Sequence, residues 1–76
     1  MLGNELRKAR MAAKLTQEQL SFAAEIDRSY ISLLEHDKKS PTVDMLFRLC
    51  DTLGVSASSL LARVEAGRKS KAKKQK

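Results

Sequence analysis

Two side chains of this chain belong to types that often do covalent or metal chemistry, and each stands alone. Cys50 is the only cysteine and His36 the only histidine among the 76 residues. Cys50 falls on the apolar face of an expected helix, which favours a core residue over a nucleophile activated by a nearby base. One cysteine and one histidine also provide neither zinc-ligand spacing nor a disulfide framework. We therefore expect no enzyme activity, no metal and no cofactor.

A second group of side chains could bind the edges of bases. Arginine pairs bidentately with guanine O6 and N7, serine bonds to several bases, and an exposed leucine can rest on a thymine methyl. All three residue types occur together in the segment that follows Asp27. For the arginine the alternative is a surface charge that pairs with Glu25 or Asp27, and for the serines it is a solvated helix surface. The candidate base-contact residues are Arg28, Ser29, Ser32 and Leu33.

Capping residues predict a short helix just before this segment. Thr16 is a good N-cap and Gln19 follows three residues later. The two can form a capping box that starts a helix over residues 17–24. The residues of this helix that are expected to face the core are Leu20, Ala23 and Ala24.

A second helix follows after a turn of only a few residues. Asp27 is its N-cap, and the helix is expected from Arg28 to about His36. Placing Ile31 and Leu34 inward turns the candidate base-contact residues outward. Two short helices joined by so tight a turn indicate a helix-turn-helix, whose second helix enters the major groove of DNA.

Three further helices complete an all-α prediction. They are expected over residues 4–13, after Pro41 as far as Gly54, and after the cap Ser56. A chain of 76 residues allows one small core, which buries only about 60% of the unfolded surface. The apolar residues expected on the inward faces of these helices are Leu2, Leu6, Ala9, Ala13, Val43, Leu46, Leu49, Cys50, Leu53, Ala57, Leu60, Leu61 and Val64.

Several anchor residues share the spacing of a known family. They are the LTQ of residues 15–17, Leu20, Ile26, the YIS of residues 30–32, Glu35, Pro41, and the LGV of residues 53–55 followed by Leu60. With these anchors the chain resembles the Cro/repressor-type (Xre) helix-turn-helix domain over residues 1 to about 65. The segment DRSYIS is most similar to the small controller proteins of restriction-modification systems. The resemblance implies a compact five-helix, lambda-repressor-like DNA-binding domain.

Three residues depart from the pattern of that family. Ser21 stands where alanine is usual, and Glu25 and Asp37 stand where glycine is common. Aspartate tolerates a left-handed backbone fairly well, whereas glutamate does so poorly. The turn at Glu25 is therefore the place where the chain departs most from the family.

One charge on the first helix needs a partner. Arg10 lies on the apolar stripe one turn after Leu6, and Glu35 lies on the inward side of its helix one turn after Ile31. A lone buried charge is costly, so we expect an Arg10–Glu35 ion pair that ties the first helix to the third. The resembled family has such a pair at the matching positions.

Residues that flank the outward face of the third helix are candidate phosphate contacts. Gln17 opens a helix, where free N–H groups and the helix dipole favour an anion, and the matching glutamine of the resembled family contacts a phosphate. The alternative for these residues is an ordinary surface position, and for Tyr30 it is packing. The candidates are Gln17, Tyr30, His36, Lys38 and Lys39.

The net charge of +6 is concentrated at the C-terminus. The chain has 15 basic and nine acidic residues, and nine of the basic and all nine acidic residues lie within residues 1–67, which leaves six basic residues in 68–76. This basic tail lacks large apolar residues, so we expect it to be disordered in isolation. It is either a solubilising end or an arm that binds phosphates without reading sequence. We therefore divide the chain into a DNA-binding domain, residues 1–66, and a basic tail, residues 67–76.

A small domain without a metal or a disulfide needs another source of stability, and we expect a homodimer. Four apolar residues border or extend the apolar faces of the last two helices. They form either the edge of the core or a two-fold dimer interface. Short apolar runs and the lack of a signal-peptide core predict a cytoplasmic protein with no membrane partner. No small-molecule ligand is evident from the sequence. The candidate dimer-interface residues are Met45, Phe47, Leu61 and Val64.

These features predict a dimeric transcriptional regulator that binds double-stranded DNA at a roughly palindromic operator. A second interpretation is an antitoxin-type protein-interaction module, whose tail binds an acidic partner and whose helix-turn-helix serves autoregulation. A third, a peripheral binder of anionic membranes, is weakened by the lack of apolar residues in the tail. Phe22 points away from the core of its helix and has no assigned role.

Overall fold

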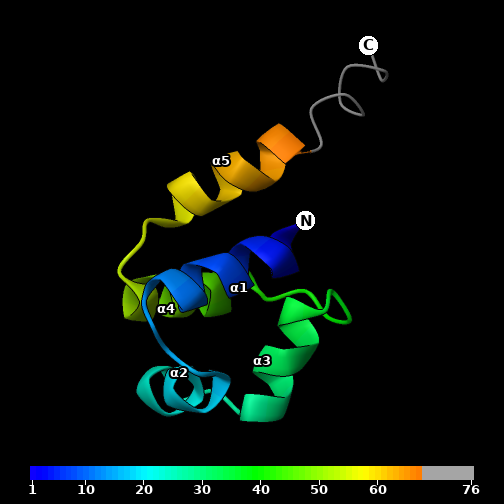
Figure 1. Cartoon of the computed structure of the whole chain (residues 1–76). Coiled ribbons are helices and arrows are strands. Elements are labelled where there is room, and N and C mark those ends of the chain that lie inside the picture. The colour runs from blue at the N-terminus through cyan, green and yellow to red at the C-terminus, as the bar shows by residue number, and fades with distance from the viewer. Residues whose placement is uncertain (68–76) are drawn as a thin grey trace.

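The computed structural model describes residues 1–67, which form five α-helices (Figure 1). No strand is present within that range, and the all-α, five-helix prediction is confirmed. The predicted basic tail, apart from Gly67 at the end of the last helix, lies outside the described residues. The helices are α1 (Leu2–Ala12), α2 (Gln17–Ala24), α3 (Arg28–Glu35), α4 (Val43–Leu53) and α5 (Ala57–Gly67).

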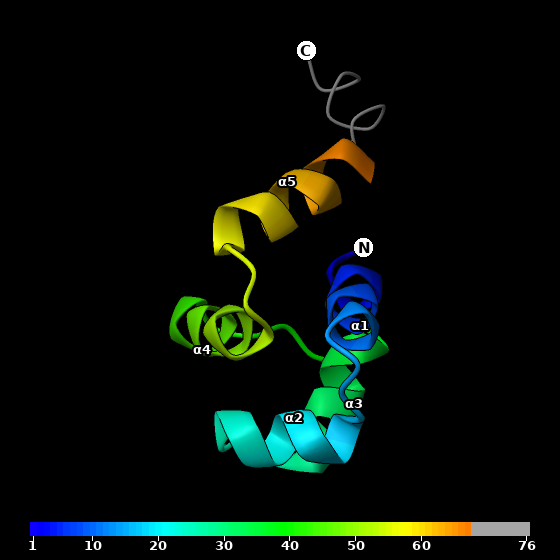
Figure 2. The ribbon, with the colours of Figure 1, turned by 60° about the vertical axis from the view of Figure 1, so that its left-hand side comes forward.

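The helices are stacked along one axis of an elongated molecule. Figures 1 and 2 show α2 and α3 at one end, α5 at the other, and α1 and α4 between them. Helix α1 packs against both α3 and α5, while α2 packs against both α3 and α4. The α2–α3 pair is therefore held by two supporting helices and lies at an end of the molecule.

All five helices contribute to one hydrophobic core. Its largest fully buried side chains are those of leucine, isoleucine and cysteine. They come from α3, α4 and α5, so the helix that carries the candidate base contacts is anchored at the centre of the core. These residues are Ile31, Leu34, Leu49, Cys50 and Leu60.

Four residues expected in the core are exposed instead. Ala23 is exposed because α2 packs through Leu20 and Ala24, which lie one turn apart on a different face. Val43 is 66% exposed because it is the first residue of α4 and precedes the buried stripe of that helix. The others are Ala13, which follows the last residue of α1, and Leu61, which is 43% exposed on α5.

Side-chain caps explain where the helices begin. The Thr16 hydroxyl accepts from the Gln19 backbone N–H at 3.0 Å, and the Gln19 side chain accepts from the Thr16 N–H at 2.9 Å, which completes the capping box. Asp27 accepts from the Ser29 N–H at 3.1 Å at the start of α3. The turn of the motif is thus bounded by a cap before α2 and a cap before α3.

Each of the first four helices is followed, within two residues of its last residue, by a residue with a left-handed backbone. Lys14, Glu25, Asp37 and Gly54 have φ angles of 62°, 58°, 57° and 75°. After each helix a backbone N–H closes back on the last turn, as in the 3.0 Å bond from the Ile26 N–H to the Ser21 carbonyl. Only the end of α4 uses the glycine that this conformation favours. The turn at Glu25 therefore adopts the left-handed conformation in spite of its glutamate.

The start of α1 lies directly against the end of α3. A Cβ built on Gly3 would lie 2.5 Å from the Leu34 carbonyl oxygen and 2.6 Å from that of Glu35. The Asp37 carboxylate accepts from the Gly3 N–H at 3.0 Å and so satisfies a free donor in the first turn of α1. Gly3 and Asp37 together allow this close approach, which the sequence had not indicated.

Candidate nucleic-acid interface

Helix α3 is positioned by one inward face and by the turn before it. Ile31 and Leu34 are 1% and 2% exposed, and Ile26 in the turn is 7% exposed. Burying Ile26 fixes the path of the chain between α2 and α3. The opposite face of α3 is left to solvent, as the predicted orientation requires.

The candidate base-contact residues lie on or beside that outward face. Arg28 and Ser29 are exposed in the first turn of α3, Leu33 is 37% exposed, and Ser32 is half-buried. Within residues 1–67 the ion pairs are Lys8–Glu5 and Arg10–Glu35, so no ion pair joins Arg28 to Glu25 or Asp27 in this part of the chain. The Arg28 guanidinium is therefore available for a ligand.

Arg10 and Glu35 form the centre of a largely buried polar network. Arg10 Nε donates to Glu35 Oε2 at 2.6 Å, and Arg10 Nη2 donates to Glu35 Oε1 at 3.1 Å. The two side chains are 12% and 2% exposed. Arg10 Nη1 also donates to the Leu15 carbonyl oxygen at 2.8 Å. The network satisfies both charges and joins α1, the following loop and the end of α3.

Gln17 belongs to the same network, which the sequence had not indicated. Its Nε2 donates to Glu35 Oε1 at 3.1 Å, and the residue is half-buried. Because Gln17 is the first residue of α2, this bond fixes the N-terminus of α2 against the end of α3. The amide side chain is engaged within the protein, and an anion would meet the free backbone N–H groups of the first turn.

The remaining candidate phosphate contacts differ in exposure. Tyr30 is half-buried and packs against the core. His36 is exposed directly after α3, with Nδ1 2.8 Å from the Ser32 carbonyl oxygen. Lys38 and Lys39 are exposed in the loop between α3 and α4. The two lysines and the histidine thus lie near the C-terminal end of α3.

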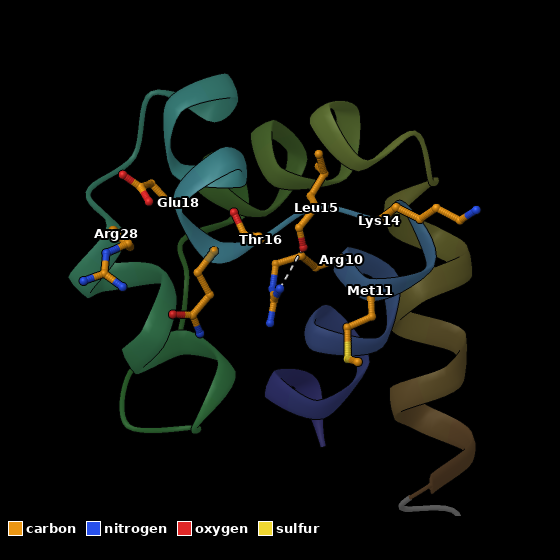
Figure 3. Close-up of a pocket in the computed structure, with 8 residues that line it drawn as sticks. Arg10, Met11, Lys14, Leu15, Thr16, Glu18 and Arg28 are labelled. Carbon is orange, nitrogen blue, oxygen red and sulfur yellow. Dashed lines mark hydrogen bonds between the residues drawn. The ribbon is translucent and has the colours of Figure 1, made fainter.

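An open cavity lies between the C-terminal end of α1 and the N-terminal ends of α2 and α3 (Figure 3). Its volume is about 540 Å³. Glu18 and Arg28 lie at one end of it, away from Met11 and Lys14. The lining residues are Arg10, Met11, Lys14, Leu15, Thr16, Gln17, Glu18 and Arg28.

The candidate dimer-interface residues occupy α4 and α5. Phe47 is 52% and Leu61 43% exposed, while Met45 and Val64 are half-buried. Met45 packs against the core. The four candidates therefore comprise two exposed apolar side chains and two half-buried ones. Phe22 on α2 is 87% exposed and is not one of them.

Cys50 is a core residue. It is 1% exposed, and burial raises the pKa of its thiol above the ordinary 9.0, with a smaller contribution from the Asp51 carboxylate. A thiol with a raised pKa is a poor nucleophile. Within residues 1–67 no group of three or more His, Cys, Asp or Glu side chains could hold a metal ion.

In the same range no single helix is long and apolar enough to cross a membrane. Helices α4 and α5 reach the required length only as a pair bent by 108°. Their apolar stripes, which include Leu49 and Leu60, are buried in the core.

A comparison with protein families places residues 6–60 in the helix-turn-helix model HTH_3. The chain belongs to the helix-turn-helix family. It is 33% identical over 61 residues to an HTH-type transcriptional regulator of Sinorhizobium fredii, a match that covers 80% of this chain and 79% of that protein. It is 32% identical over 60 residues to the immunity repressor of Bacillus phage phi105, which covers 79% of this chain. The chain spans only 42% of the length of that repressor.

Solved structures agree with the family assignment. The restriction-modification controller protein C.AhdI from Aeromonas hydrophila is 30% identical, with a TM-score of 0.75, over 78% of this chain and 89% of that one. The biofilm regulator SinR, solved in complex with DNA, is 26% identical, with a TM-score of 0.77, over 80% of this chain and 98% of that one. The five helices therefore form a helix-turn-helix domain of the kind found in these regulators.

Proposed function

We propose that this helix-turn-helix chain regulates transcription as a homodimer that reads a roughly palindromic operator in double-stranded DNA. The observation that carries the proposal is Arg28, exposed and free of a carboxylate within 4 Å at the N-terminal end of α3. In this motif the first residues of the recognition helix contact base edges in the major groove. The similar fold of SinR, whose structure contains DNA, supports the same use of α3 here.

The residues around Arg28 divide into two roles. We assign base reading to the outward side chains of α3, with Arg28 on guanine and Leu33 on a thymine methyl. Phosphate contacts position the protein without reading sequence. We assign them to the backbone of the first turn of α2 and to exposed groups near the C-terminal end of α3. The base-reading set is Arg28, Ser29, Ser32 and Leu33, and the phosphate set is Gln17, Tyr30, His36, Lys38 and Lys39.

The two-fold interface in this proposal is the apolar patch of α4 and α5. Phe47 and Leu61 expose apolar surface that a second copy would cover, and the half-buried Met45 and Val64 would add to it. A dimer of this kind places two recognition helices in successive major grooves, about 34 Å apart. We further propose that the protein acts in the cytoplasm.

Binding to variants of one duplex tests the proposal. A preferred duplex is selected from a random library, and the affinity of the protein is then measured for every single-base change in it. Arg28→Ala should lose discrimination at one or two base pairs of each half-site, worth about 1 to 3 kcal/mol. An unchanged preference profile would exclude Arg28 from base reading.

Lys39→Ala is the matched control. It removes one exposed positive charge near α3, as Arg28→Ala does, but from the candidate phosphate set. It should weaken all duplexes by a similar factor and leave the ranking of bases intact. Gln17 is less suitable as a control because its side chain also supports Glu35.

A further inference from the structure

A second open cavity, of about 510 Å³, lies between α1, the start of α2 and the end of α3. All the residues that line this polar cavity are polar or charged. It shares Arg10 and Gln17 with the cavity of Figure 3, which extends to Arg28. The polar cavity therefore adjoins the surface on which we place the DNA.

Most of the charges in the polar cavity already have a partner. Arg10 donates twice to Glu35, and its remaining terminal nitrogen donates to a backbone carbonyl. The Asp37 carboxylate accepts from a backbone N–H of α1 at 3.0 Å. Arg7, one turn before Arg10 on α1, is exposed and belongs to neither of the ion pairs found among residues 1–67. The Arg7 guanidinium is thus the cation of this cavity that is available for a ligand.

The hydrogen bond of His36 determines when its side chain can join Arg7. Nδ1 is 2.8 Å from the Ser32 carbonyl oxygen, which only accepts, so Nδ1 carries a hydrogen. In the neutral ring the other nitrogen, Nε2, then has a lone pair and would repel a phosphate oxygen. In the imidazolium form Nε2 also carries a hydrogen and can donate to that oxygen.

The charge of the polar cavity gives the same requirement. With neutral His36 the two arginines of the cavity balance the carboxylates of Glu35 and Asp37, and the other lining residues, Asn4 and Gln17, are uncharged. Protonation of His36 gives the cavity a net positive charge, which favours an anion. The N-terminus of α2, which borders the cavity, adds the positive end of a helix dipole.

We propose that the polar cavity binds one backbone phosphate of double-stranded DNA, held by the Arg7 guanidinium and the His36 imidazolium. The inference rests on the proposed function, in which α3 lies on DNA, and it adds Arg7 to the phosphate contacts. It also makes one phosphate contact depend on pH, because histidine is the side chain that changes charge between about pH 5 and 8. Affinity for all duplexes should rise as the pH falls through this range, while the preference among bases stays unchanged.

The pH dependence is measured by comparing the natural chain with His36→Gln on one labelled duplex. Glutamine is uncharged at every pH. At about pH 5.5 the natural chain should bind about two- to five-fold more tightly than His36→Gln, the range for a charge pair near the surface. At about pH 8.5 the natural chain should have lost this advantage.

Arg7→Gln tests the guanidinium. At about pH 5.5 it should weaken all duplexes by a similar factor and reduce the slope of log affinity against log salt by roughly 0.9, because one phosphate contact is lost. Arg63→Gln is the matched control. It removes an exposed arginine from α5, at the opposite end of the molecule from α2 and α3, and should leave the slope unchanged (Figures 1 and 2).

A shared phosphate is the decisive point. Duplexes are prepared in which one phosphate at a time is replaced by an uncharged methylphosphonate. At one position of each half-site the replacement should abolish both the effect of Arg7→Gln and the advantage of the natural chain over His36→Gln at low pH.

The outcomes separate this inference from the proposed function. If the two effects map to different phosphates, or if the natural chain and His36→Gln differ by the same factor at both pH values, the inference is overturned. Unchanged affinity in Arg7→Gln would overturn it as well. The proposed function fails on other results, namely that no duplex is preferred or that Arg28→Ala leaves the base preference unchanged.

Discussion

The Arg10 guanidinium holds the Glu35 carboxylate through hydrogen bonds of 2.6 and 3.1 Å across 25 residues of sequence. Since Gln17 donates to the same carboxylate, one side chain connects the end of α3 with α1 and with the start of α2. The orientation of the proposed recognition helix therefore depends on an ionic contact as well as on apolar packing. Glu35 is the only charged residue among the buried positions of residues 1–67.

Removing one member of this pair should strongly destabilise the fold. Arg10→Met leaves the Glu35 carboxylate, 2% exposed, without its positive partner, at an expected cost of about 3 to 5 kcal/mol in the free energy of unfolding. The double variant Arg10→Met, Glu35→Leu removes both charges and should recover much of that loss. Urea unfolding followed by circular dichroism measures all three proteins.

The exposed Lys8–Glu5 ion pair is the control for the buried Arg10–Glu35 pair. Its atoms are 3.7 Å apart and the Lys8 side chain is 64% exposed, so Lys8→Ala should cost no more than about 1 kcal/mol. Equal losses for Lys8→Ala and Arg10→Met would show that burial does not govern the Arg10–Glu35 contact.

A second prediction concerns Gly3, which lies at the contact between α1 and α3. In Gly3→Ala the new Cβ would meet the carbonyl oxygens of Leu34 and Glu35 at 2.5 and 2.6 Å, so a helix must shift. Such overpacking against backbone should cost at least about 1 to 3 kcal/mol, although alanine favours helices more than glycine. Gly67→Ala is the control, since a Cβ there meets nothing within 4 Å. Similar melting temperatures for the two variants would contradict the close approach.

The sequence predicts the elements of this fold well because its local signals are strong. The Thr16–Gln19 capping box and the Asp27 cap place α2 and α3 at the expected residues. The three-residue spacing of Ile31 and Leu34 predicts the inward face of α3 correctly. Both side chains are fully buried in the core. These features depend on residues near in sequence, whose spacing is visible without a tertiary structure.

The predictions that fail depend on how one helix meets another. Ala23 and Val43 have the right polarity for a core, yet the contacts of α2 and α4 leave them exposed. The bond between Gln17 and Glu35 and the contact of Gly3 with α3 join residues far apart in sequence, and no local pattern marks them. Of the proposed DNA contacts, the sequence supplies the residue types, while the exposure of each side chain requires the structure.

Glu25 gives a third prediction, based on its left-handed backbone. A non-glycine residue in this conformation is strained by about 1 to 2 kcal/mol, whereas glycine adopts it without this strain. Glu25→Gly should therefore raise the free energy of unfolding by roughly 1 kcal/mol, since φ is already 58° and the side chain is exposed. Thermal melts of this variant and of Gly54→Ala, which should lose stability because φ is 75° there, measure the effect in both directions.

Asp37 is the matched case in which a glycine should help less. Its φ is 57°, close to that of Glu25, but its carboxylate accepts from the Gly3 N–H at 3.0 Å. Asp37→Gly relieves the backbone and loses that bond, so its net gain should be smaller than that of Glu25→Gly. A larger gain for Asp37→Gly would mean that the bond to α1 contributes nothing to stability.

The buried thiol of Cys50 gives a dependence of stability on pH. Burial, with a smaller contribution from Asp51, raises the pKa of the folded-state thiol above its ordinary 9.0. Above pH 9.0 the unfolded chain therefore loses this proton first, and stability falls as pH rises through the folded-state value. The contribution is complete below pH 9.0 and its loss is at most about 1.4 kcal/mol per pH unit.

Comparison with Cys50→Ala isolates this effect from the tyrosine and lysine side chains that titrate in the same range. The variant loses stability at neutral pH because it leaves a cavity in the core, and that loss does not depend on pH. The free energy of unfolding of the natural chain should therefore exceed that of Cys50→Ala most at pH 7 to 8. The difference should shrink as the pH is raised from about 9 to 10.5, in urea titrations under reducing conditions. A difference that stays constant over this range would show that the thiol has the same pKa in the folded and the unfolded chain.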